Sequence, residues 1–424
     1  MIRGLPGLIP LAVAALTVTA AGAASAPRAE PLPSSFCSKV ASGGVAAPDY
    51  LIVSDLGLQN GAVPARMVAA IKFVLAQHRF KAGAYTIGYQ SCDDSTPQSP
   101  QGDLAKCASN AKAYAADSSV VGVIGAWSSR CSEVELPIVG RSASGPLVLV
   151  SPTNTNPGLT HASGGSAPGE PRRYYPTGRR NLARLASADD FQGLAAAVFA
   201  KQLRLKRVFV LDDAESYGLD VAGGYTRAAR NLGLTPAGAA SWDVSQTSFK
   251  ALAARVARAR PDGVLLGGYA CPACGALIKA LHADVPSAKL IVPDGFLPVD
   301  ALVKVAGTAA EGLYLIEPGL PPSEFGPVGQ ALQRKFGRSQ AEAGGAPVAA
   351  QAVEVLLAAI ARSGGSRSSV TSHVLGDPVR GGILGNFAFD RNGDMVPGPV
   401  AVYRLQHGRQ ALDRVLRVSS RLLR

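Results

Sequence analysis

The chain has 424 residues, more than one ordinary domain needs and a natural length for two. A hydrophobic fraction of 47% and a charged fraction of 17% exclude a largely disordered chain. The formal net charge of +12 would suit nucleic acid, but the basic residues are scattered apart from pairs at 172–173 and 179–180, so we expect no nucleic-acid partner.

The N-terminus predicts export. Arg3 is the only charge before a run of apolar and small residues from Leu8 to Ala24, and Ala-Ser-Ala at 24–26 has the form of a signal-peptidase site. We therefore expect residues 1–26 to be a cleaved signal peptide and the mature protein to be secreted into an extracytoplasmic compartment of the cell envelope. Residues 27–47, rich in Pro, Ser, Gly and Ala, are expected to form an extended leader.

All six cysteines follow the predicted signal, and an even number in an exported chain favours disulfides. Cys271 and Cys274 are the predicted local pair. The sequence leaves open which of three pairings joins the other four, Cys37, Cys92, Cys107 and Cys131. The spacing Cys-Pro-Ala-Cys at a helix start also resembles the redox motif of thiol–disulfide proteins, which gives an alternative function of another class.

Strands and helices alternate along most of the chain, which predicts doubly wound parallel sheets. A first unit runs through strands near Leu51–Ser54 and Tyr85–Tyr89 to two apolar runs, VGVIG and PLVLVS. The basic segment 161–181 then interrupts the pattern, as a solvated loop or as a flap carrying Tyr174 and Tyr175.

The alternation resumes with strands from Arg207 to Ile316, so the sequence predicts a second α/β unit. Helical segments are expected at Phe325–Phe336 and Pro347–Arg362. An Asn-Gly turn at 392–393 predicts a hairpin between Leu384–Phe389 and Ala401–Leu405.

Polar clusters follow the two apolar runs of the first unit, at Ser128 and Ser129 and at Thr153, Asn154 and Thr155. In open α/β sheets, ligands lie outside the carboxyl ends of the strands. These clusters are therefore the predicted ligand-binding residues.

Motifs for catalysis are missing. No dinucleotide or P-loop glycine pattern follows a predicted strand, and GRSASG at 140–145 misses the nucleophile elbow by one residue. The five histidines are not spaced as metal ligands. We expect no catalytic residue, no cofactor, no metal and no enzyme activity.

With these pieces in order, the chain resembles the type I extracellular solute-binding proteins of branched-chain amino-acid ABC transporters. The resemblance runs from about Tyr50 to Leu405. It is carried by VIGAWSS, VLVSPTNTNPGLT, ADDFQG, VFVLDDAESYG, PDGVLLGGY, IVPDGF, AEGLYLIEP and GNFAFDRNGDM.

The resemblance implies an α/β protein of two doubly wound lobes joined by three crossover strands. Lobe 1 would comprise residues 48–182 and 318–383, and lobe 2 residues 183–317 and 384–424. The implied function is to capture a small zwitterionic ligand, an amino acid of the branched-chain kind, between the lobes. A monomer would then deliver it to an ABC permease.

In the first lobe, the resemblance places Ser129 where the family binds the ligand carboxylate. Thr153, Asn154 and Thr155 fall on the segment that holds both the carboxylate and the amino group. The family usually has small residues at the first two of these three positions. The ligand therefore also stays open to an amide, urea or an aromatic acid, and the chain to a ligand-sensing receptor role.

In the second lobe, Tyr217 matches a tyrosine that covers the ligand, and Tyr269 lies in the family's Gly-Gly-Tyr element. Asp294 matches an acid that faces the ligand ammonium. This agrees with the chemistry of a zwitterion, which needs donors for its carboxylate and an anion for its ammonium.

Overall fold

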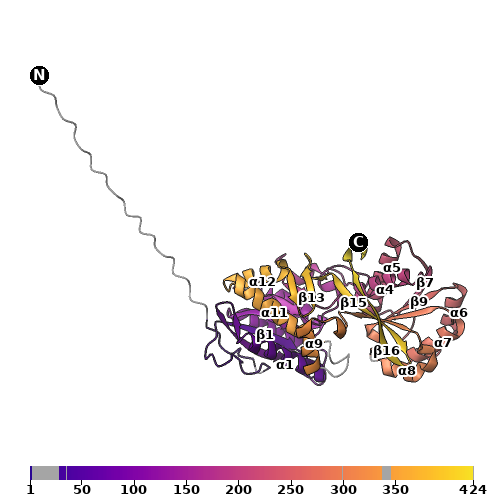
Figure 1. Ribbon diagram of the computed structural model, residues 1–424, viewed down its shortest axis with the longest axis horizontal. Helices are drawn as coiled ribbons and strands as arrows, with labels where there is room; N and C mark the ends of the chain where they lie inside the picture. The colour runs from indigo at the N-terminus through magenta and orange to yellow at the C-terminus, as the bar shows by residue number, and fades with distance from the viewer. Residues whose placement is uncertain (2–27, 35, 298, 337–344, 424) are drawn as a thin grey trace.

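The computed structural model describes Met1 and residues 28–423, apart from 35, 298 and 337–344. The predicted signal peptide thus lies outside the described residues, except for Met1. The chain forms two lobes, each built on its own sheet, that lie side by side (Figure 1).

The first sheet has the order β2-β3-β1-β4-β5-β6, and all neighbours are parallel except β2 and β3. Its central strands are apolar and fully buried, because helices cover both faces. The strands are β1 (Tyr50–Leu56), β2 (Lys81–Ala82), β3 (Tyr85–Asp93), β4 (Val120–Gly125), β5 (Leu149–Ser151) and β6 (Leu182–Arg184).

Two stretches of sequence supply the helices of this lobe, and α11 from the later stretch packs against α1 from the earlier one. A 19-residue helix with a mean hydropathy of 1.3, α11 has 67% of its most apolar window buried, as expected of a core helix. The helices are α1 (Ala62–Gln77), α2 (Leu104–Ala116), α3 (Ser129–Val139), α9 (Pro327–Phe336), α11 (Gly345–Ser363) and α12 (Arg367–Gly376).

The second sheet has the order β16-β15-β11-β10-β9-β7-β8, in which β7 to β11 are parallel and β15 and β16 antiparallel. Its strands are β7 (Arg207–Asp212), β8 (Thr235–Ser241), β9 (Gly263–Gly267), β10 (Lys289–Pro293), β11 (Tyr314–Pro318), β15 (Gly398–Gln406) and β16 (Arg409–Val418).

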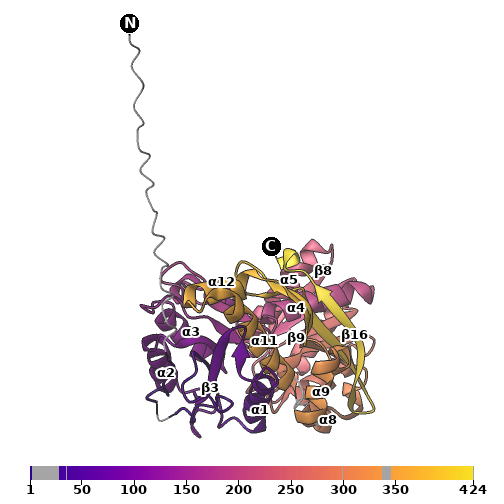
Figure 2. The same cartoon turned by 60° about the vertical axis from the view of Figure 1, so that its left-hand side comes forward.

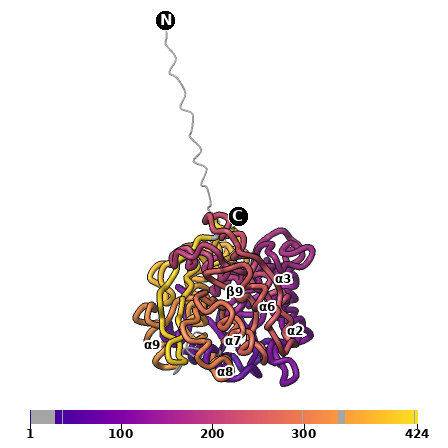
Figure 3. The backbone as a smooth tube through the Cα atoms, turned by 90° about the vertical axis from the view of Figure 1, so that its right-hand side faces the viewer, coloured from indigo at the N-terminus to yellow at the C-terminus, as the bar shows by residue number. Residues whose placement is uncertain are grey.

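Helices also cover this second sheet, and Figure 3 looks onto the lobe from the side of α6, α7 and α8. The chain ends beside α5, where the Asn231 side chain donates to the Leu422 carbonyl at 2.9 Å (Figure 2). The helices are α4 (Asp189–Gln202), α5 (Ser216–Asn231), α6 (Lys250–Arg258), α7 (Cys274–Asp284) and α8 (Val299–Ala306).

The predicted hairpin after residue 383 is wrong in its pairing. The Asn-Gly turn joins β13 (Gly385–Phe389) to the short β14 (Met395–Val396), and β12 (Val379–Gly382) completes this small sheet. The strand expected as the hairpin's second arm is β15, which pairs with β11 and β16 instead. The paired residues of β11 and β15 are 82 to 90 positions apart in the chain, so their pairing leaves no local signal, whereas the turn residues do.

The lobe boundaries stay a prediction. The prediction assigns residues from 384 onward to lobe 2. The side chains of Leu384, Phe387 and Met395 nevertheless pack into the hydrophobic core of the first sheet.

The predicted leader and the segment 161–181 are both packed against the first lobe. In the leader, Ala29 and Leu32 are buried, and Ala41 forms an isolated antiparallel bridge with Tyr89. In the segment 161–181, the rings of Tyr174 and Tyr175 are 3% and 6% exposed and belong to the same core cluster. These two rings therefore do not form a flap.

Three disulfides are present: Cys37–Cys92, Cys107–Cys131 and Cys271–Cys274. The first ties the leader to β3, and the second ties α2 to α3. The sequence left three pairings of these four cysteines open, and the structure shows Cys37 with Cys92 and Cys107 with Cys131.

Three acids lie fully buried beneath the carboxyl edge of the first sheet: Asp55 on β1, Asp94 after β3 and Glu135 on α3. Burial raises the pKa of Asp55 to about 6, although a hydrogen bond from Glu135 lowers it. Burial and the charge of Asp55 raise the pKa of Asp94 to about 8, and burial with the charges of Asp55 and Asp94 raises the pKa of Glu135 well above its usual value. The folded protein therefore holds protons here that the unfolded chain releases above pH 4.

A folded-state pKa above the unfolded one gives stability that is present in acid and is lost as the pH rises through the folded value. We expect the free energy of unfolding to fall between pH 5 and pH 8. In Glu135→Gln, that fall should shrink by about 1.4 kcal/mol or more, the equivalent of one pKa unit. Urea denaturation at both pH values measures it, with the exposed Glu324→Gln as control. An unchanged fall in Glu135→Gln would contradict this account.

Candidate functional site

The first polar cluster lies between β4 and α3. Ser128 is the N-cap of α3, and its hydroxyl accepts from the Cys131 N–H at 3.3 Å. The Ser129 hydroxyl accepts from the Asn156 N–H at 3.2 Å, so its own O–H remains to donate. A helix start with a serine hydroxyl is suited to bind an anion such as a carboxylate.

The second cluster follows β5 and is fastened to the first. The Thr153 hydroxyl donates to the Trp127 carbonyl at 2.6 Å. Asn154 is fully buried; its Oδ1 accepts from Ser132 at 2.5 Å and its Nδ2 donates to the Ala126 carbonyl at 3.1 Å. The Asn154 amide is thus used inside the protein, where it holds the two loops together.

The three predicted residues of the second sheet come together at the carboxyl ends of its strands. The Tyr217 hydroxyl, from the first turn of α5, donates to Asp294 Oδ1 at 2.5 Å and accepts from the Gly295 N–H at 3.0 Å. Tyr269 is 54% exposed and stacks on Tyr217, with ring centroids 4.4 Å apart. Burial raises the pKa of Asp294 despite the bond from Tyr217.

The first turn of α4 contacts both groups. The Asp189 N–H donates to the Thr155 carbonyl at 2.9 Å, on the side of the first sheet. Gln192 Oε1 accepts from the Asp294 N–H at 3.1 Å, on the side of the second sheet, and Gln192 Nε2 donates to Asp189 Oδ1 at 3.5 Å. A chain of hydrogen bonds therefore runs from Thr155 to Asp294.

Sequence reasoning missed two acids near Asp294. Asp189 is 5% exposed, and burial together with the charge of Asp294 raises its pKa well above the usual value. Glu317 ends up beside Asp294 because β11 pairs with β10 in the register Pro293 to Ile316. Burial and the charge of Asp294 raise the Glu317 pKa to about 7. The segment ADDFQG contains Asp189 and Gln192. Which of its side chains face the sheets depends on the residue at which α4 begins, Asp189.

Among the described residues, one group of side chains has the spacing to hold a metal ion. Ligand atoms of Asp94, Cys107, Cys131 and Glu135 lie within 4.8 Å of one another. Both sulfurs belong to the Cys107–Cys131 disulfide, which removes the thiolates that a metal would need. The donor set therefore does not fit a metal while the disulfide is formed.

The sequence profile of the family described as periplasmic binding protein matches residues 66–410. The chain belongs to this family.

Other members of the periplasmic binding protein family are similar in sequence at moderate identity. The leucine-, isoleucine-, valine-, threonine- and alanine-binding protein of Pseudomonas aeruginosa is 24% identical over 276 residues, 64% of this chain and 69% of that protein. A Leu/Ile/Val-binding protein homolog of Brucella suis is 26% identical over 64% of this chain and 72% of its own length.

Solved structures share the fold. A leucine binding protein from Thermotoga maritima superposes with a TM-score of 0.64 at 22% identity, covering 87% of this chain and 98% of that one. A solute-binding protein from Rhodopseudomonas palustris in complex with benzoate gives 0.60 at 15% identity, over 86% and 95%. The expected resemblance and fold class are confirmed.

In this family member, a buried network of charges lies where β6 leaves the first sheet. Arg184 is fully buried and donates to Asp394 Oδ1 at 2.5 Å, to the Asn156 carbonyl at 2.8 Å and to the Thr160 hydroxyl at 2.6 Å. His161 Nδ1 lies 3.3 Å from Asp394 Oδ2, and His161 Nε2 lies 2.8 Å from Oδ2 of Asp190 on α4. The network therefore joins the small β13–β14 sheet, the 156–161 loop and the second lobe.

Removing one partner of a buried ion pair leaves the other charge uncompensated. We expect Asp394→Asn to lower the free energy of unfolding by about 3–5 kcal/mol. Asp413→Asn is the matched control, because its pair with Arg414 is exposed and is worth less than about 1 kcal/mol. Urea denaturation at pH 7 measures both variants. An equal loss of unfolding free energy in the two variants would show that the buried pair stabilises the protein no more than the exposed one.

Proposed function

We propose that this protein captures a small zwitterion, an amino acid, in the cleft between its two lobes. The observation that carries the proposal is the chain of hydrogen bonds through the first turn of α4, which links anion-binding donors near Ser129 to acids around Asp294. The ligand carboxylate would lie at the start of α3, bound by Ser129 and Thr155. Ser128, Thr153 and Asn154 would support these loops, because their side chains are bonded within the protein.

The ligand ammonium would face Asp294, with Tyr217 holding that carboxylate and Tyr269 covering the ligand. Three acids, Asp189, Asp294 and Glu317, lie together at this end of the cleft, and a cation here would relieve the repulsion from Asp294 that helps to raise the pKa of Asp189 and Glu317. An aromatic acid has no cation to offer, and a neutral amide or urea would leave the charge of Asp294 uncompensated. This chemistry favours an amino acid over those alternatives.

The relatives support the same ligand class and a role in transport. Names among them specify leucine, isoleucine and valine, and one solved structure from Streptococcus pneumoniae holds isoleucine. We propose a branched-chain amino acid as the ligand and an ABC permease as the partner of the exported, non-enzymatic monomer. Binding would close the lobes, as hinged binding proteins do.

Replacing the acid while keeping its shape tests the proposal. We expect Asp294→Asn to weaken amino-acid binding at least tenfold, or about 1.4 kcal/mol, because the ligand ammonium loses its counter-charge. Ser129→Ala should weaken it less, since backbone donors remain. Calorimetry measures both, with the exposed Asp300→Asn on α8 as control. Unchanged affinity in Asp294→Asn would remove this acid from the site.

A further inference from the structure

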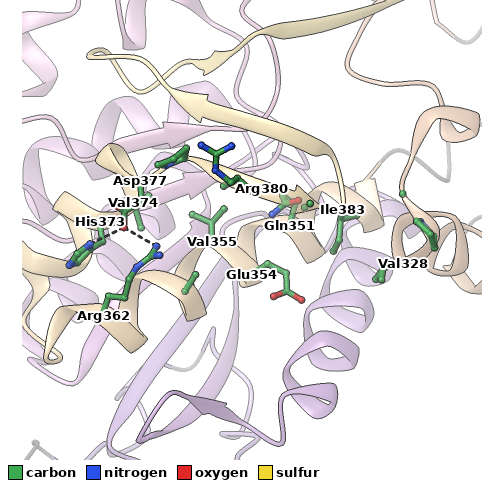
Figure 4. A pocket seen from close by; sticks show the side chains of 17 residues that line it. Val328, Gln351, Glu354, Val355, Arg362, His373, Val374, Asp377, Arg380 and Ile383 are labelled. Atoms are coloured by element: carbon green, nitrogen blue, oxygen red, sulfur yellow. Dashed lines mark hydrogen bonds and ion pairs between the residues drawn. The ribbon is translucent and has the colours of Figure 1, made fainter.

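A cavity of about 680 Å³ lies in the first lobe, and none of the residues proposed for the cleft lines it (Figure 4). It lies between α11, α12 and β12, with the start of α9 at one side. Its volume is within the range of about 300–1,000 Å³ that small-molecule sites occupy. Volume alone identifies no ligand, so the lining has to be considered group by group.

The floor of the cavity contains a buried donor without an acceptor. Gln351 is 1% exposed, and its Oε1 accepts from the Leu384 N–H at 3.1 Å. That bond fixes the orientation of the amide, and its Nε2 has no hydrogen-bond partner in the described part of the chain. A buried amide N–H without an acceptor is costly, so an acceptor brought by a ligand would be favoured here.

Glycine at position 382 lets the backbone of β12 lie close against the oxygen of this amide. A Cβ at Gly382 would lie 2.5 Å from Gln351 Oε1, closer than two such atoms can approach. The pairing of Gly382 with Gly385 brings the backbone of this small sheet over the amide. The Leu384 N–H and the close approach of Gly382 therefore hold the Gln351 amide in place in the lining of the cavity.

Among the charged side chains that line the cavity, one basic group has no acidic partner in the described part of the chain. Asp377 is paired with both Arg362, at 2.8 Å, and His373, at 2.9 Å (Figure 4). Glu354 is paired with His78 at 3.0 Å. Arg380 is exposed and forms no ion pair with a described residue. The groups left over, a guanidinium and an amide N–H, are both hydrogen-bond donors.

Val355, Val374 and Ile383 supply apolar lining next to these donors (Figure 4). We propose that the cavity is a second small-molecule site, which binds an organic monocarboxylate with an apolar body. The carboxylate pairs with Arg380 and accepts from Gln351 Nε2, and the apolar body lies along the valine and isoleucine side chains. This inference is independent of the ligand proposed for the cleft.

Calorimetric titration of the full mature protein with hexanoate, hexanamide and hexylamine tests the proposal. Hexanoate should bind at least tenfold more tightly than either of the other two, because only it offers an anionic acceptor. Arg380→Ala should weaken hexanoate binding at least tenfold, whereas Arg391→Ala, at an exposed position in the turn before β14, should leave it unchanged.

Gln351→Glu is the sharper variant. It keeps the acceptor for the Leu384 N–H but replaces the Nε2 donor with an oxygen, so hexanoate binding should be lost. The double variant Ser129→Ala, Thr153→Ala should bind hexanoate like the wild type, which separates this cavity from the cleft.

Three results would overturn the proposal: no preference for hexanoate over hexanamide, equal hexanoate affinity in Arg380→Ala and the wild type, or loss of hexanoate binding in the cleft variant alone. Because Arg380 is exposed, its replacement decides the matter even if Gln351→Glu fails to fold.

Discussion

The pair of Arg184 and Asp394 fixes the region where the two lobes meet. A buried guanidinium must have its partners in place, because leaving its charge uncompensated costs several kcal/mol. The partners of Arg184 come from the 156–160 loop and from the β13–β14 turn. Once these are held, Thr155 and the first turn of α4 are held as well, and they connect the two halves of the proposed ligand site.

His161 extends the same network into the second lobe. Burial by itself would lower its pKa, but hydrogen bonds to Asp190 and Asp394 outweigh burial and raise it to about 9. The imidazole is therefore charged at neutral pH. Because the folded-state pKa is the higher one, this contribution to stability is complete below about pH 6.5 and is lost as the pH rises through 9. The buried acids of the first lobe lose stability over a lower range, with folded pKa values of about 6 and 8.

Local patterns in the sequence were enough for the parallel sheets. Apolar runs such as VGVIG, followed by serines, predicted both a buried strand and a polar strand end. Contacts between distant segments were not predictable in this way. The strand pairing of β15 with β11, the place of Glu317 beside Asp294 and the burial of Tyr174 all depend on such contacts.

The candidate site shows the same division. The order of the motifs indicated Tyr217 and Asp294, which the structure joins by a hydrogen bond of 2.5 Å. The internal use of the Asn154 amide depends on Ser132 and Ala126, which lie more than 20 residues away. No spacing rule in the sequence distinguishes a buried asparagine that joins two loops from one that faces a ligand.

Two charges on one ligand, bound from opposite ends of the cleft, are the central claim. The most direct test takes the amino acid that raises the melting temperature most in a thermal-shift screen. Its affinity is then compared by calorimetry with the affinities of two analogues, one without the amino group and one without the carboxylate. The account predicts that each analogue binds at least about a hundredfold more weakly, or about 2.8 kcal/mol. An analogue that binds as tightly as the amino acid itself would contradict it.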